Sequence, residues 1–140
     1  MAYSEKEIDT IFKRIINAIS IDNMSLRAAL RMEGMPTSET FFKWIDADKD
    51  KSIQYARACN QRADNIFEEI LEIADDSSND VKITEDGIQT VNSEFVQRSK
   101  LRVDARKWML GKMNPKKYGD RNTTTSEIEE ITPIFNLNVE

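Results

Sequence analysis

Apolar residues recur every three or four positions through most of the chain, which is the spacing of helices that bury one face. A first helix is predicted over residues 4–20, where Ser4 and Glu7 have the capping-box spacing. A second, short helix is predicted over residues 25–31. It ends where residues 34–36 (Gly-Met-Pro) break the pattern.

A third helix is predicted over residues 39–46, with Thr37 or Ser38 as its cap. Its aromatic residues, including Trp44, are expected to form the bulky part of a small core. Three short helices with a tight turn between the second and third are typical of a helix-turn-helix. We therefore predict a helix-turn-helix domain over residues 1–50.

Two longer helices follow, over residues 51–75 and 94–113, and the second is expected to end at Asn114 and Pro115. The first contains neither Gly nor Pro and would be roughly 37 Å long. Between them, residues 81–84 and 88–91 flank a turn and predict a short β-hairpin. The sequence thus predicts a mainly α protein, in which residues 51–121 form a long antiparallel helical hairpin with the β-hairpin at its tip.

The apolar faces of these two helices are broader than one hairpin can cover, so we expect the hairpin to join copies of the chain into a closed ring. The residues expected at the contacts are Ile66, Phe67, Ile70, Leu71, Val103, Trp108 and Leu110.

Residues 122–140 form a tail of different composition. A polar run is followed by the apolar positions Ile131, Phe135, Leu137 and Val139, whose partial alternation indicates a strand after Pro133. A lone strand is not stable in water. We expect it to join an intersubunit β-barrel. The alternative is a peptide that docks on a larger partner.

Composition excludes several classes of function. The chain has 140 residues, enough for one domain or two small modules, with no His and one Cys, Cys59. The usual general base, intrachain disulfides and Cys-based zinc sites are therefore excluded. The four glycines do not match a P-loop or a dinucleotide-binding fingerprint. We expect no enzymatic activity, no cofactor and no metal. With no apolar run near 20 residues, we also expect a soluble, cytoplasmic protein.

The net charge of −5 is unevenly distributed. Residues 1–64 carry ten basic and ten acidic side chains, and residues 65–97 carry one basic and nine acidic. Residues 98–121 carry nine basic and two acidic, and the tail carries four acidic and no basic. The acidic cluster over residues 68–76 is more simply a solvated face than a divalent-metal site. The basic block pairs either with the acidic helix or with nucleic acid.

The helix-turn-helix is the candidate DNA-binding site. In this motif the start of the second helix faces the major groove, and neighbouring basic residues contact phosphates. The residues in the first role are Thr37, Ser38, Thr40 and Lys43, and those in the second are Arg27, Arg31, Lys49 and Lys51. Because the domain is neutral overall and Glu39 lies at its reading edge, binding by one copy is expected to be weak and salt dependent.

Several ordered strings resemble the terminase small subunit of tailed double-stranded DNA bacteriophages. They are residues 62–64 (Arg-Ala-Asp), 66–76 (Ile-Phe-Glu-Glu-Ile-Leu-Glu-Ile-Ala-Asp-Asp), 91–94 (Val-Asn-Ser-Glu), 96–108 (Val-Gln-Arg-Ser-Lys-Leu-Arg-Val-Asp-Ala-Arg-Lys-Trp) and 114–121 (Asn-Pro-Lys-Lys-Tyr-Gly-Asp-Arg). A looser match extends back to Ser25 and includes Arg27, Thr40 and Trp44.

The resemblance implies a non-enzymatic packaging protein in the host cytoplasm. Such a protein would form a ring, expected to have eight or more copies. It would recognise viral double-stranded DNA, and it would recruit and regulate the large terminase subunit, which carries the ATPase and nuclease. Two other functions remain open on the residues alone: a helix-turn-helix transcriptional repressor with an oligomerising C-terminal half, and a structural ring or adaptor that does not touch DNA.

Overall fold

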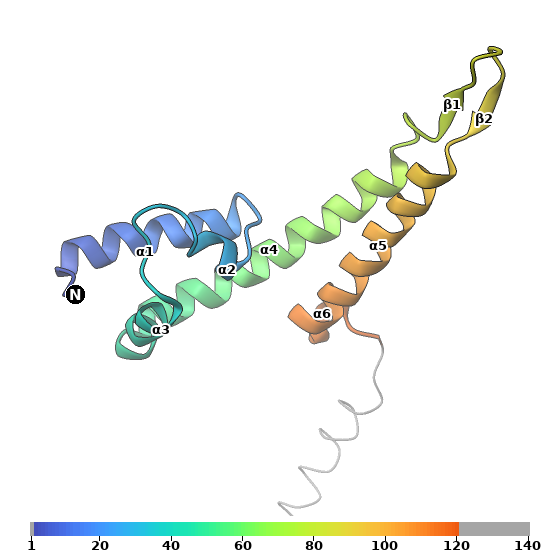
Figure 1. Ribbon diagram of the computed structural model, residues 1–140. Helices are drawn as coiled ribbons and strands as arrows, with labels where there is room; N and C mark the ends of the chain where they lie inside the picture. Colours follow the sequence, from blue (N-terminus) through green and yellow to red (C-terminus); the bar gives the residue numbers. More distant parts are fainter. Residues whose placement is uncertain (1, 121–140) are drawn as a thin grey trace, which may run out of the picture.

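A computed structural model describes residues 2–120 of the chain. It contains α1 (Glu5–Ser20), α2 (Leu26–Ala29), α3 (Ser38–Ala47), α4 (Lys49–Asp75), β1 (Val81–Ile83), β2 (Gln89–Val91), α5 (Ser93–Met113) and α6 (Pro115–Tyr118). The first three helices gather around the first half of α4, and α5 runs back along its second half (Figure 1). The predicted mainly α fold with a small β-hairpin is confirmed.

The N-terminal core joins α1, α2, α3 and the start of α4. Phe12 and Ile15 of α1, Ala29 of α2 and Phe41 of α3 are buried together with Ala58 of α4. The rings of Phe12 and Phe41 stack with centroids 5.8 Å apart. Burying apolar side chains of this size stabilises the fold by about 1.5–3 kcal/mol each. The first three helices are therefore held on α4 rather than forming a separate unit.

Side-chain caps fix where the helices of this region begin. The hydroxyl of Ser4 accepts from the backbone N–H of Glu7, whose carboxylate accepts from the N–H of Ser4, so the predicted capping box is present. Ser25 caps α2 and Thr37 caps α3 through the same type of hydrogen bond. Local polar residues therefore mark the first residue of each of these three helices.

The second half of α4 packs against α5 in an antiparallel pair. Its core is smaller than the first and contains Ala63 and Ile66 of α4 with Leu110 of α5. An ion pair between Glu69 and Arg106, 3.1 Å long and half-buried, joins the two helices. Since α4 also enters the N-terminal core, one continuous helix crosses the boundary predicted at residue 50.

The β-hairpin extends beyond the far end of the helical pair (Figure 1). Val81 pairs with Val91 and Ile83 with Gln89 in an antiparallel register. In the turn, the N–H of Gly87 donates to the carbonyl of Thr84 over 2.9 Å. Gly87 has φ of 78°, a left-handed conformation that glycine adopts without steric cost.

Two features differ from the sequence prediction. The chain was expected to leave helical structure at Pro115, but Pro115 is the first residue of α6, where proline's fixed φ suits a helix start. Helix α2 has four residues rather than the expected seven. Within residues 2–120, no helix is both long enough and apolar enough to cross a bilayer. The predicted tail strand and barrel lie outside the described residues.

Candidate functional site

The start of α3 presents the residues predicted to face the major groove. The Thr37 hydroxyl accepts from the N–H of Thr40 at 3.2 Å and donates to the Thr40 hydroxyl at 3.1 Å. Thr37 and Ser38 are exposed, and Thr40 is half-buried. The two threonine side chains therefore take part in the cap of α3, whereas Ser38 is exposed on its first turn.

The two faces of α3 have different roles. Phe41 is fully buried and Trp44 is 9% exposed, so the expectation that Trp44 belongs to the core is confirmed. On the opposite face, Phe42 is 43% exposed, and the ammonium of Lys43 lies 3.4 Å from the carboxylate of Glu39. The exposed face of α3 therefore carries paired charges rather than a net positive charge.

The predicted phosphate contacts fall into two groups. Arg27, Arg31 and Lys49 are exposed on α2, on the turn after it and on the first turn of α4. Lys51 was also expected to be exposed, but its side chain is only 13% exposed, and its ammonium lies 2.8 Å from Asp9 and 3.2 Å from Asp48.

These contacts explain the burial of Lys51. The hydrogen bond to Asp9 is the largest of several effects that raise the pKa of Lys51, and its ammonium also lies 5.5 Å from the ring centre of Phe12. Lys51 therefore ties α4 to α1. Within residues 2–120, the other three predicted phosphate contacts, Arg27, Arg31 and Lys49, form no ion pair, whereas the groove-facing Lys43 is paired with Glu39.

The residues predicted to join copies of the chain also divide. Ile66 and Leu110 are buried inside the chain's own helical pair, and Ile70 and Val103 are half-buried. The exposed members are Phe67, Leu71 and Trp108, with exposed fractions of 40%, 48% and 67%. Sequence periodicity found the apolar positions, but it could not separate those used within one copy from those left on the surface.

Part of the basic block pairs within the chain. Besides Arg106 with Glu69, the ammonium of Lys117 lies 2.9 Å from the carboxylate of Asp64. Arg98 pairs with Glu94 on its own helix at 2.6 Å. Within residues 2–120, the other basic side chains of the block form no ion pair; they are Lys100, Arg102, Lys107, Lys112 and Lys116. Arg121 lies outside the described residues.

Asp64, which was not singled out from the sequence, fastens α6 to α4. It accepts a 2.6 Å hydrogen bond from the Tyr118 hydroxyl in addition to the contact with Lys117. These two hydrogen bonds hold the pKa of the Asp64 carboxyl below its usual value and raise the pKa of both partners. The Tyr118 ring stacks on Phe67 with centroids 5.3 Å apart.

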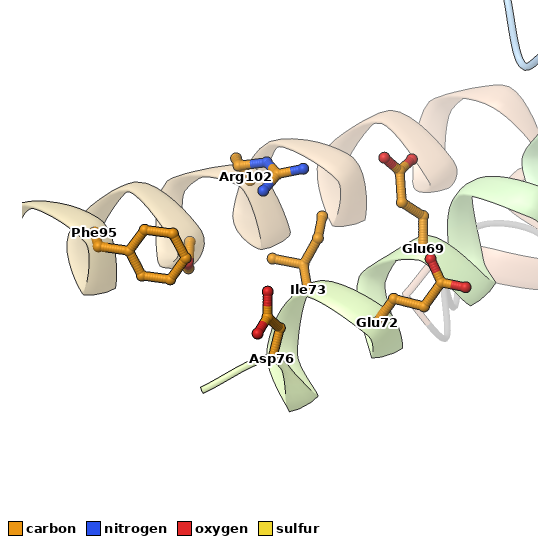
Figure 2. A pocket seen from close by; sticks show the side chains of 7 residues that line it. Glu69, Glu72, Ile73, Asp76, Phe95 and Arg102 are labelled. Atoms are coloured by element: carbon orange, nitrogen blue, oxygen red, sulfur yellow. The ribbon is translucent and has the colours of Figure 1, made fainter. Parts of the chain in front are cut away.

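A shallow hollow of about 180 Å³ lies between α4 and α5 near the β-hairpin. Figure 2 shows Arg102 reaching from α5 toward Ile73 and Asp76, with Glu69 and Glu72 farther along α4. Hydrogen bonds from Ser78 and, more weakly, the charge of Arg102 keep the pKa of Asp76 low. Within residues 2–120, no three His, Cys, Asp or Glu side chains are placed to hold a metal ion.

Comparisons with known proteins identify the family. Residues 3–125 match the family described as bacteriophage Sf6, terminase small subunit-like. The chain belongs to this terminase small subunit family. Crystal structures of three single-residue variants of the terminase small subunit gp1 of the bacterial virus Sf6 are also similar. Each shares 36% sequence identity with the chain, covers 86% of this chain and 80% of the other, and has a TM-score of 0.53.

A comparison with curated proteins gives no match. Membership of the terminase small subunit family confirms the resemblance seen in residues 62–76 and 96–108. It makes the chain a phage DNA-packaging protein, and it favours packaging over a transcriptional repressor with a similar DNA-binding motif.

Proposed function

We propose that this protein is the non-catalytic recognition subunit of a viral packaging machine. It assembles through its helical hairpin into a ring of eight or more copies and presents its N-terminal regions to viral double-stranded DNA. It then recruits and regulates the large terminase subunit in the host cytoplasm. The family supports the packaging role, and the surface of the hairpin supports assembly.

The proposal of a ring rests mainly on the exposed apolar surface of the hairpin. Trp108, Leu101 and Leu71 are each about half or more exposed, although they lie on helices whose inner faces are already packed. A soluble chain seldom leaves such large apolar side chains together in water. Contacts between different surfaces of successive copies close into a ring when the rotation between copies allows it.

DNA recognition is proposed for the surface formed by α2, the start of α3 and the start of α4. Arg27, Arg31 and Lys49 are exposed there, and Ser38 is exposed at the start of α3. Because the acidic Glu39 lies beside Lys43, one copy is expected to bind weakly. A ring places many copies on one DNA molecule, which multiplies weak contacts through effective concentration.

Native mass spectrometry tests the assembly directly. The proposal predicts a single closed species of eight or more copies at micromolar concentration. A monomer or dimer under the same conditions would contradict the proposed ring.

Charge reversal tests the DNA surface. The variant Arg27→Glu with Lys43→Glu should lose DNA binding while it retains the ring. Single removal of a phosphate-contacting side chain should lower the slope of log K against log salt by about one per bound copy. The matched control is Lys82→Glu with Asn79→Glu and Gln89→Glu, which changes the net charge equally but lies at the β-hairpin. Unchanged binding by the first variant would move the DNA contact to the basic block of residues 98–121.

A further inference from the structure

We propose that neighbouring copies join edge to edge, with the outer edge of α5 in one copy packed against the outer edge of α4 in the next. The α5 edge consists of Lys100, Leu101, Asp104, Lys107 and Trp108, and the α4 edge consists of Glu68, Leu71 and Asp75. The inference rests on the proposed ring and specifies which surfaces of each copy meet.

The composition of the two edges is complementary. Leu101 and Trp108, 66% and 67% exposed, are seven residues apart, which places them on one side of α5 about two turns apart. A lysine precedes each of them in the sequence. On α4, Leu71 is 48% exposed and lies between two exposed carboxylates, Glu68 and Asp75, which are also seven residues apart.

The charged groups of both edges are available to a partner. Glu68, Asp75, Lys100 and Lys107 are exposed, and none of them forms an ion pair with any residue in the described part of the chain. By contrast, the inward-facing Glu69 and Arg106 are already paired with each other. Within the described residues, the α4 edge therefore carries two unpaired carboxylates, whereas the α5 edge carries two unpaired ammonium groups and the single carboxylate of Asp104. The net charges of the two edges are opposite in sign.

The inner ion pair also fixes which residues lie level along the hairpin. Since Glu69 is opposite Arg106 and the helices are antiparallel, a step backward on α4 matches an equal step forward on α5. Glu68 therefore lies level with Lys107, and Asp75 lies level with Lys100. Leu71 lies level with Asp104, between Leu101 and Trp108.

Rotational symmetry converts this internal register into a contact between copies. Rotation about a ring axis leaves the height of each residue along that axis unchanged. If the hairpins stand parallel to the axis, residues that lie level within one copy therefore meet at the contact between neighbouring copies. Each copy then offers Glu68 to Lys107 and Asp75 to Lys100 of its neighbour, while Leu71 packs against Leu101 and Trp108 on either side of Asp104. The seven-residue spacing and flanking charges resemble the seam of a coiled coil, where such charges choose the partner and its register.

Two charge-reversed variants test this arrangement. The α5-edge variant, Lys100→Glu with Lys107→Glu, has two acidic edges, and the α4-edge variant, Glu68→Lys with Asp75→Lys, has two basic edges. Each alone should lose the ring, since like charges then face each other at every junction. An equimolar mixture should assemble into rings with an even copy number and equal numbers of the two variants, as counted by native mass spectrometry.

The control is Lys6→Glu with Lys13→Glu on α1, which changes the net charge as the α5-edge variant does and should form the ring normally. Circular dichroism checks that each variant retains its helices. The edge contact would be overturned if either variant assembled alone, or if the mixture stayed dissociated. Assembly of the α5-edge variant with loss of DNA binding would assign Lys100 and Lys107 to nucleic acid instead. Failure of the unaltered chain to form a ring would contradict the proposed function itself.

Discussion

Two charged side chains, Lys51 and Asp64, connect helices that are distant in the sequence. Lys51 and Asp64 each bind two groups, and each fastens a neighbouring helix to α4. The sequence placed Lys51 on the DNA surface, and Asp64 was noted only as part of a string that resembles the family, with no role of its own. In the sequence both residues look like ordinary solvated charges, because the partners that matter are distant along the chain. Lys51 is more than 40 residues from Asp9, and Asp64 is more than 50 residues from Lys117 and Tyr118.

Removing the charge of Asp64 should loosen α6. Because the pKa of Asp64 is lowered in the folded chain, its contribution to stability is full above the unfolded pKa of about 3.9. That contribution disappears as the pH falls through the lower folded value. Asp64→Asn should therefore melt below the unaltered chain at pH 7, and the two melting temperatures should converge only as the pH falls below the unfolded pKa and through the lower folded one. Glu33→Gln, an exposed carboxylate on the α2–α3 connection, is the control; a constant difference at all pH values would contradict the prediction.

Adjacent phenylalanines on α3 provide a second test at this scale. Phe41 is fully buried, whereas Phe42 is 43% exposed. Phe41→Ala should lower the free energy of unfolding by about 3–5 kcal/mol, because it removes a ring from a packed core. Phe42→Ala should lower it by less than about 1.5 kcal/mol. Urea unfolding followed by circular dichroism measures both, and equal losses would refute the orientation of α3.

At the scale of elements, local signals explain why most boundaries could be predicted. Ser4 with Glu7 and Thr37 mark the starts of α1 and α3, and the chain between α2 and α3 contains Gly34 with φ of 81°. Helix α6 was missed although its signal is present, since Asn114 is a capping residue and Pro115 suits the first helical position. Which apolar positions stay exposed depends on how the helices pair, and no local pattern contains that information.

The two sides of α5 should respond differently to truncation. Leu110 is 3% exposed inside the helical pair, so Leu110→Ala should cost about 2–5 kcal/mol of unfolding free energy. Trp108 is 67% exposed, so Trp108→Ala should change the stability of a dilute, dissociated chain by no more than about 0.5 kcal/mol. The same variant should shift the ring toward smaller species in sedimentation experiments. A large loss of stability in the dilute chain would mean that Trp108 supports the fold rather than assembly.

At the scale of the whole molecule, the tail is expected to contribute to assembly or to recruitment. The sequence favours a strand that joins an intersubunit barrel, with a docking peptide for the large subunit as the alternative. Deleting residues 131–140 should then lower the thermal stability of the ring or change its copy number, as read by native mass spectrometry. An unchanged ring that no longer binds the large subunit would leave the docking peptide as the correct interpretation.

The continuous helix α4 connects the N-terminal core rigidly to the hairpin core. Only the four residues 59–62 separate the last α4 residue of the N-terminal core, Ala58, from the first of the hairpin core, Ala63. At this junction Arg62 donates to the carbonyl of Asn23, and Asn65 donates to the carbonyl of Ser20. These contacts hold the N-terminal helices in a fixed orientation to the hairpin. In the proposed ring, a tilt of one hairpin would move its N-terminal end through a wider arc than the hairpin itself. The spacing of the proposed DNA-binding surfaces would then depend on how closely neighbouring hairpins pack.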